Sequence, residues 1–310
     1  MTALCSKFMQ NRYTDLNTYL RGLFGCRVQK ITIDAGLGCP NRDGTLSRAG
    51  CIYCNQKGSG TGAAAQGKSI TQQAEQAKHA LIRRYKAKKF IAYFQSYTNT
   101  YAPTHRLKEL YDEALAVEGM VGLFAGTRPD CVNDENLDLL ASYQDQYLVW
   151  VEYGLQSVHD ATLSRINRGH DFAAFENAVE GARKRGIHVC AHVILGLPGE
   201  SEKHMIQTAK TLSAMDINGV KIHLLYVVKN TVLHQWYDQG RYTCLTQNEY
   251  VNLTCAFLTH LRDDIIISRL TGDPHPEELI APAWAINKTQ TLNQIRNTLE
   301  QQNLYQGMHA

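Results

Sequence analysis

Short apolar runs recur along the chain at intervals of roughly 30 residues, as they do in a series of βα units. The runs are rich in Val, Ile and aromatic residues, which is typical of buried strands. We predict six strands, at residues 28–34, 89–94, 120–126, 146–155, 188–195 and 219–227. The stretches between them have helical spacing, and we predict helices at 69–87, 103–118, 133–144, 171–185 and 200–215.

Residues that cap helices well stand near the starts of several of these segments, and the expected caps are Thr71, Asn133 and Ser201. Helical crossovers between consecutive strands make the strands parallel. Six such units can curl into an open, partial version of the eight-stranded TIM barrel or lie flat as a doubly wound sheet, and periodicity does not choose between them. In both folds the active site lies at the carboxyl ends of the strands.

The alternation of strands and helices stops after residue 228. A helix at 246–262, a short strand at 264–269 and a last helix at 285–302 are predicted there. We therefore expect three parts: an N-terminal extension at 1–27, a barrel at 28–228 and a C-terminal α+β extension at 229–310 that covers the substrate site.

Composition narrows the class of protein. With 310 residues, of which 44% are hydrophobic, the chain can bury a substantial core, and disorder is not expected. The formal net charge of +3 is too small to indicate a nucleic-acid partner. The N-terminus lacks a signal-peptide pattern and no apolar run reaches membrane-spanning length, so we expect a cytoplasmic protein with no membrane partner. Nine cysteines in such a chain point to reduced thiols and to a metal or cluster site.

Three of those cysteines, Cys39, Cys51 and Cys54, stand on one glycine-rich loop directly after the first predicted strand. Structural zinc normally has four protein ligands, whereas a [4Fe–4S] cluster held by three cysteines keeps one iron free to bind another molecule. The number three favours the cluster. A zinc site completed by Cys26 or a histidine, or three unrelated thiols, remain as alternatives.

With Tyr53 in front of its last cysteine, this loop resembles that of the radical S-adenosylmethionine (SAM) superfamily. The long spacing between the first two cysteines is similar to that of the small bacterial Elongator-like branch, as are the motifs CPNRDGT, AYFQ, TNT, GTRPDC, INRGHDF and HLL. The resemblance implies a partial (βα)6 TIM-type barrel that holds a [4Fe–4S] cluster and SAM. It also implies reductive cleavage of SAM to a 5′-deoxyadenosyl radical, with Tyr53 beside the bound cofactors.

Polar residues alternate on the fourth predicted strand, where Glu152, Gly154 and Gln156 share one face. A polar face on a buried strand needs a ligand or hydrogen bonds within the barrel. The resemblance implies that Glu152 and Gln156 contact the methionine or ribose part of SAM.

The resemblance assigns further SAM contacts to the ends of other strands. It implies that Arg168 lies near the SAM carboxylate, that His192 meets the ribose, and that the backbone of Gly196 to Pro198 borders the adenine. The second strand lacks the glycine-rich contact that the family uses for the methionine amino group, so Gln95, Ser96 and Thr98 are expected to replace it.

Two further polar residues, Lys221 and His223, alternate inward on the sixth predicted strand. They are the candidate catalytic residues, for substrate binding or for proton transfer.

The Elongator-like resemblance implies a tRNA substrate, with a wobble-uridine 5-carboxymethylaminomethyl group processed toward 5-aminomethyluridine, and an electron donor such as flavodoxin or ferredoxin. The basic runs at 83–89 and 183–185 are modest support for tRNA, because runs on predicted helices are more often solvated faces. Two alternatives remain. One is a radical SAM enzyme that acts on a small metabolite or a protein, and the other is a non-catalytic Fe–S or zinc protein that binds RNA.

Overall fold

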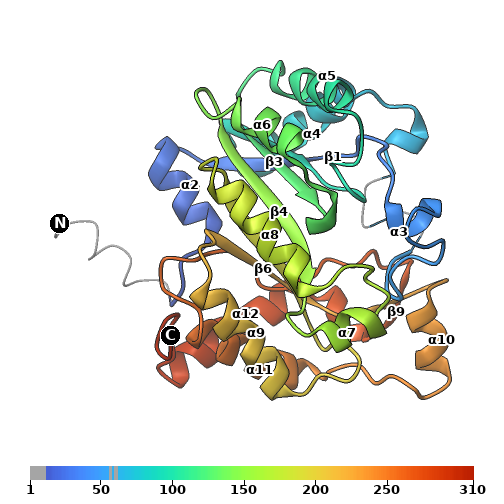
Figure 1. Cartoon of the computed structure of the whole chain (residues 1–310). Coiled ribbons are helices and arrows are strands. Elements are labelled where there is room, and N and C mark those ends of the chain that lie inside the picture. The colour runs from blue at the N-terminus through green and yellow to red at the C-terminus, as the bar shows by residue number, and fades with distance from the viewer. Residues whose placement is uncertain (1–11, 56–57, 59–61) are drawn as a thin grey trace.

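A single parallel sheet organises the computed structural model, which describes residues 12–55, 58 and 62–310 (Figure 1). Its strand order is β1-β2-β3-β4-β5-β6-β8. The strands are β1 (Val28–Ile33), β2 (Lys89–Phe94), β3 (Met120–Thr127), β4 (Leu148–Gln156), β5 (His188–Leu195), β6 (Gly219–Leu224) and β8 (Ile266–Arg269). Because the strands follow one another in sheet order without a switch point, the fold is an open half-barrel and not a doubly wound sheet.

The six predicted strands are confirmed, but the segment expected at 264–269 lies elsewhere than predicted. We placed it in the C-terminal extension, whereas Ile266–Arg269 pairs with β6 as the seventh parallel strand of the barrel sheet. The sequence hid this because no single helix of ordinary length joins β6 to β8. The sixth predicted strand also ends early, at Leu224, and Val227–Val228 (β7) pairs antiparallel with Leu279–Ala281 (β9).

Helices cover the outer face of the sheet, and the main hydrophobic core lies between the two layers. They are α4 (Ile70–Tyr85), α5 (Thr104–Leu115), α6 (Asp134–Ala141), α8 (Phe172–Arg183) and α9 (Glu202–Ala214). The expected caps Asn133 and Ser201 are confirmed. The expected cap Thr71 is wrong, because the helix is capped two residues earlier by Ser69, which forms a capping box with Gln72 and so satisfies two backbone N–H groups at once.

Shorter elements close the two ends of the half-barrel (Figure 1). At the amino end lies α2 (Leu16–Phe24), while α3 (Pro40–Asp43), α7 (Asp160–Arg165) and α10 (Val232–Asp238) gather at the carboxyl end. The chain continues through α11 (Gln247–Thr259) and α12 (Lys288–Gln301), with 3-10 turns at Ala64–Gln66, Pro129–Cys131 and Ala283–Ile286. No helix in the described part of the chain is both long and apolar enough to cross a membrane.

The inside of the half-barrel is apolar toward the amino end. Trp150 is 1% exposed there, stacks on Phe124 with ring centroids 5.4 Å apart, and meets Tyr19 of α2 edge-on. His188 stacks on the other face of the indole at 5.3 Å, so this histidine belongs to the core. We call this cluster of Trp150, Phe124, Tyr19 and His188 the aromatic plug. It fills the amino half of the barrel, so the polar side chains of the interior lie in the carboxyl half.

Replacing the central aromatic residue of this plug tests the packing. We expect Trp150→Ala to lower the free energy of unfolding by about 3–5 kcal/mol, because it leaves a cavity inside the barrel. Leu23→Ala on the exposed face of α2 is the control and should cost less than about 0.5 kcal/mol in the same urea titrations. Equal losses for the two variants would contradict a plugged barrel.

Candidate active site

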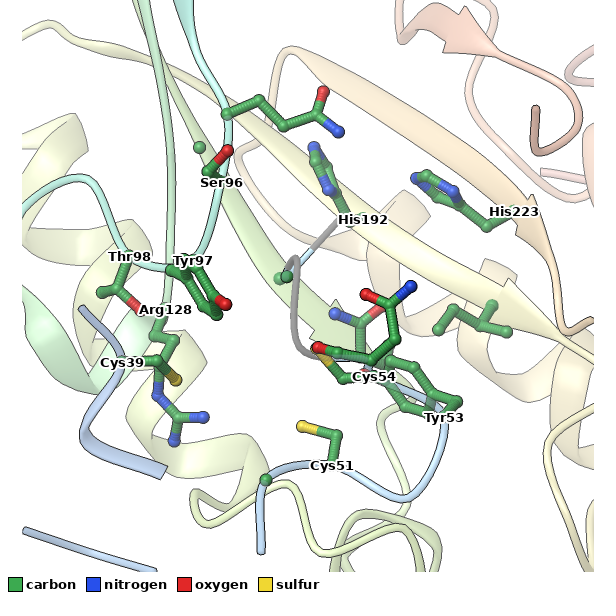
Figure 2. Close-up of a pocket in the computed structure, with 18 of the residues that line it drawn as sticks. Cys39, Cys51, Tyr53, Cys54, Ser96, Tyr97, Thr98, Arg128, His192 and His223 are labelled. Carbon is green, nitrogen blue, oxygen red and sulfur yellow. The ribbon is translucent and has the colours of Figure 1, made fainter. Parts of the chain in front are cut away.

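A cavity of ≈ 330 Å³ opens at the carboxyl ends of the strands, where the fold predicts an active site (Figure 2). The cysteine loop, the barrel strands and a segment of the C-terminal extension all contribute to its walls. Of the predicted site residues, those that line it are Cys39, Cys51, Tyr53, Cys54, Gln95, Ser96, Glu152, Gln156, Arg168, His192 and His223.

The three cysteines of the loop face this common cavity (Figure 2). Backbone hydrogen bonds fix the loop across the barrel mouth, because the Ile52 N–H donates to the Ile166 carbonyl at 3.1 Å and the Asn167 side chain donates to the Gly50 carbonyl at 2.7 Å. All three thiols border the same cavity, so this loop is the place where a metal group would be held.

The zinc alternative needs a fourth ligand, for which Cys26 was one candidate. Cys26 directly precedes β1, whereas Cys39 follows that strand. The two thiols therefore lie at opposite ends of the barrel, and Cys26 does not complete a site with the cysteine loop.

Arg168 is buried directly behind the cysteine loop. Its Nη1 lies 3.6 Å from Cys51 Sγ, and its Nε and Nη2 donate to the Gly154 carbonyl at 3.1 and 2.6 Å. Burial raises the pKa of Cys51, but the charge and hydrogen bond of Arg168 outweigh it, so that the pKa lies below its usual value. Arg168 thus supports a thiolate, and this contact adds to the expected one with the SAM carboxylate.

Two neighbours explain why Arg168 has this position. Arg128 forms a paired contact with Asp130, at 2.9 and 2.7 Å, and its Nη1 donates to the Arg168 carbonyl at 2.9 Å. A Cβ on Gly154 would stand 2.6 Å from Arg168 Nη2, so only glycine leaves room for the guanidinium.

Burial and the charge of Cys51 raise the pKa of the third cysteine, Cys54, to about 11. Metal binding by that thiol therefore has to displace a proton.

Unpartnered polar atoms at the end of β2 indicate a bound polar ligand. Ser96 and Thr98 are 2% and 0% exposed, line the cavity, and have hydroxyl groups with no hydrogen-bond partner in the described chain. Leaving such groups without a partner is costly. The backbone is strained in the same place, since Tyr97 has φ 56° and Gln156 has φ 81° although neither is glycine. These features fit the expected methionine end of SAM.

Glu152 lies at the centre of a buried ionic network inside the barrel. It is 1% exposed, and its carboxylate accepts from Lys30 and Lys221, each at 3.2 Å, and from His192 Nε2 at 2.7 Å. Burial opposes ionisation of Glu152, yet the two lysines hold its pKa well below the usual value. Burial also lowers the pKa of His192 to about 4, so at neutral pH this imidazole is an uncharged donor to the carboxylate.

The two candidate catalytic residues occupy different depths. Lys221 lies beneath the cavity wall at 3% exposure, where its Nζ donates to the Tyr93 hydroxyl at 2.5 Å. His223 does line the cavity, and its Nδ1 accepts from Arg269 Nη2 at 2.5 Å. Burial and the charge of Arg269 lower the pKa of His223 well below its usual value.

Gly196 and Pro198 do not border this cavity. They line a second one of ≈ 490 Å³, together with Arg165, Trp236 and Arg241. The Tyr242 hydroxyl donates to the Gly196 carbonyl at 3.0 Å from the C-terminal extension. The structure therefore separates these two residues from the other expected SAM contacts.

The basic runs at 83–89 and 183–185 are also distant from the cavity. They precede β2 and β5, and so lie at the amino end of the sheet. Arg183 and Arg185 are paired with acidic side chains of neighbouring helices and turns. These two arginines therefore already have partners within the chain, and neither run contributes to the cavity.

Sequence reasoning missed several residues that shape the site. Lys30 was inside a correctly predicted strand, and its charge in an otherwise apolar run was a usable signal. Arg269 ends β8, and the rule that strand ends carry function would have found it had that strand been placed in the barrel. Asn55 and Glu278 are joined by a 2.8 Å hydrogen bond across the cavity mouth, for which the sequence offers no local signal.

The chain is similar in sequence and in fold to known proteins. Residues 36–212 match the Radical SAM superfamily, and residues 217–301 match the Radical_SAM C-terminal domain. The uncharacterized protein YtqA of Bacillus subtilis is 41% identical over 96% of this chain and 92% of its own length. A tRNA uridine(34) acetyltransferase of Dehalococcoides mccartyi is 27% identical over 49% of this chain and 33% of its own. The archaeal Methanocaldococcus infernus Elp3 structure superposes with a TM-score of 0.69 at 16% identity, covering 90% of this chain and 64% of that one, which supports the fold.

The buried Lys221 generates a prediction about stability and pH. Burial lowers its pKa to about 7 against the opposing effect of Glu152, whereas an unfolded lysine has a pKa of about 10.4. Between these values the unfolded chain binds more protons, so the free energy of unfolding rises with pH, by up to about 1.4 kcal/mol per pH unit. This contribution is complete above the unfolded pKa and is lost as pH falls through 7.

We therefore expect the stability of the wild type relative to Lys221→Met to increase by about 2 kcal/mol between pH 7 and pH 9, measured by urea unfolding. Lys108→Met, on the exposed face of α5, is the matched control and should show no such trend. Parallel pH profiles for the wild type and Lys221→Met would contradict the buried, deprotonating lysine.

Proposed function

The chain belongs to the radical SAM superfamily, and we propose that it binds a [4Fe–4S] cluster through Cys39, Cys51 and Cys54 and modifies the wobble-uridine side chain of tRNA. The observation that carries the proposal is that the three thiols face one cavity whose lining also includes buried hydroxyl groups without partners in the described chain. When bound, the cluster and SAM supply the reductive cleavage that yields a 5′-deoxyadenosyl radical. The residues of the chain bind and orient the cofactors and the substrate, and they exclude water from the cavity.

Each part of the cavity has a proposed task in holding the two cofactors. Arg168 keeps the Cys51 thiolate ready for iron, while the Tyr53 ring packs on the apolar cluster around Ile52 and shields the loop. Ser96 and Gln95 are proposed to contact the methionine end of SAM, with the Thr98 hydroxyl beside them.

The other strands are proposed to hold the remainder of SAM. Gln156 and His192 reach the cavity from β4 and β5, where they face the expected ribose. Glu152 orients the neutral His192 ring through its 2.7 Å contact. Gly196 and Pro198 act on the adenine only through the backbone that separates the two cavities.

The C-terminal extension is proposed to close the site over its substrate. Glu278 accepts a hydrogen bond from Asn55, which directly follows Cys54, and its carbonyl accepts from the Lys229 N–H at 2.9 Å. These contacts join the cysteine loop, the end of the barrel and the extension at one point. Such closure keeps water away from a reactive intermediate.

The tRNA substrate is supported by the relatives and by one surface feature. The Dehalococcoides mccartyi relative is named for uridine 34 of tRNA. At the carboxyl end of the barrel, the Arg241 guanidinium lies 4.9 Å above the Trp236 ring, and Arg165 borders the same second cavity. Cationic and aromatic groups of this kind bind single-stranded RNA. In the proposed reaction SAM accepts the equivalent of a hydride from the CH2 of the carboxymethyl group, which converts SAM to methionine and 5′-deoxyadenosine. Water then hydrolyses the resulting imine, so that the carboxymethyl group leaves as glyoxylate and 5-aminomethyluridine remains.

Removing one thiol of the loop tests the cluster. After anaerobic reconstitution, we expect Cys54→Ala to lose the bound cluster and all detectable 5′-deoxyadenosine formation from SAM, because three ligands are needed to hold it. Cys26→Ala, at the other end of the barrel, should keep both. Circular dichroism should show the same folded barrel in each variant. A Cys54→Ala protein that still produces 5′-deoxyadenosine would refute the assignment.

The tRNA proposal has its own test. We expect total tRNA from a strain that lacks this protein to contain 5-carboxymethylaminomethyluridine in place of 5-aminomethyluridine and its derivatives. The reconstituted protein with SAM and a reductant should restore them, as measured by liquid chromatography and mass spectrometry of nucleosides. Unchanged wobble nucleosides in that strain, together with intact SAM cleavage, would point to a small-molecule or protein substrate.

A further inference from the structure

Lys30 and Arg269 outnumber the one carboxylate in the ionic layer of the barrel interior. Lys30, Lys221 and Arg269 project from β1, β6 and β8, and in the described chain Glu152 is the one carboxylate that forms an ion pair with any of them. Burial lowers the pKa of Lys221 to about 7 and lowers the pKa of His192 and His223, so the positive charge is carried mainly by Lys30 and Arg269. The acidic residues at the cavity wall have other partners, since Asp273 pairs with Lys288 and Glu278 accepts from Asn55. A partly buried surplus of charge is costly unless an anion offsets it.

Arg269 is the cation of this group that reaches the cavity. His223 holds it in place by accepting from Nη2 at 2.5 Å, which leaves the rest of the guanidinium to other partners. Its Nε is buried and has no hydrogen-bond partner among the described residues. A guanidinium positioned in this way matches the planar, two-oxygen geometry of a carboxylate.

The position of His223 places this pair in the cavity. Figure 2 shows His223 and Cys39 on opposite sides of the cavity, with His192 between them. The His192 and His223 rings are 5.5 Å apart. Because Arg269 contacts His223, an anion bound by Arg269 lies beside His223.

We propose that Arg269, held by His223 and supported by the charge of Lys30, is the subsite for a carboxylate of the substrate. The inference rests on the proposed function only for the identity of that carboxylate, which is then the carboxymethyl group of the wobble side chain. Neutral or purely cationic substrates leave the surplus charge unpaired and bind weakly. Arg269 is a specificity residue for the acidic end of the substrate.

Binding of two nucleosides tests the subsite without tRNA and without turnover. The probes are 5-carboxymethylaminomethyluridine and 5-aminomethyluridine, titrated calorimetrically into the anaerobically reconstituted protein with SAM present. We expect the wild type to bind the carboxylate-bearing nucleoside roughly tenfold to a hundredfold more tightly, as a charged hydrogen-bonded pair predicts. Arg269→Gln should abolish this preference and leave SAM affinity unchanged.

Two further variants serve as controls for the Arg269→Gln result. Arg269→Lys keeps the positive charge but loses the two parallel N–H donors of the guanidinium, and should retain part of the preference for 5-carboxymethylaminomethyluridine. Arg106→Gln, on the exposed surface of α5, should behave as the wild type. If Arg269→Gln does not fold, Arg269→Lys alone decides the matter.

The outcomes separate this inference from the proposed function. A preference that depends on Arg269, without any change to tRNA, keeps the subsite and rejects the tRNA reaction. Conversion of tRNA with no such preference rejects the subsite and keeps the reaction. Equal binding of both nucleosides, no binding of either, or a tenfold loss of SAM affinity in Arg269→Gln overturns the inference, the last because the charge then serves the SAM carboxylate.

Discussion

The polar half of this half-barrel depends on the ion pairs and the hydrogen bond that the buried Glu152 carboxylate forms with Lys30, Lys221 and His192. An open barrel has two sheet edges, here β1 and β8, and its interior must be satisfied without the closure that a complete barrel provides. Lys30 spans that gap, because its Nζ contacts Glu152 of β4 and Ser268 of β8, both at 3.2 Å. Lys30 thus joins the two edges directly, and Glu152 also binds Lys221 of β6, so one carboxylate ties β1, β4 and β6 together across the barrel interior. Below this layer the Trp150 plug excludes water, and above it the cavity begins.

This layered interior explains why the cavity has its chemical character. The floor is ionic, and the walls carry thiols and hydroxyl groups that lack partners in the described chain. Buried groups of this kind reduce the stability of the empty protein, and such costs are concentrated where ligands bind. The left-handed backbone at Tyr97 and Gln156 belongs to the same pattern, since both residues line the cavity.

The cysteine loop and the C-terminal extension are coupled in a way that suits a reaction sheltered from water. The loop is held by hydrogen bonds to the segment after α7, and by Leu233 N–H, which donates to the Ile52 carbonyl at 2.8 Å from α10. Asn55 and Glu278 then join the residue after Cys54 to the extension. The cysteine loop and the C-terminal extension are therefore mechanically connected.

The sequence by itself determined the six βα units, the parallel sheet and the position of the cysteine loop after β1, because apolar periodicity and cysteine spacing are local signals. It also placed Glu152, His192 and His223 on inward faces, since side chains alternate along a strand. Only the tertiary structure decided that Arg168 supports Cys51, that Lys221 lies beneath the cavity while Gly196 and Pro198 border another one, and that β8 brings in Arg269. Alternation states which face a residue occupies, but the partner across the barrel depends on strand order, register and the depth of each side chain. Those are set by contacts between segments that lie far apart in the chain.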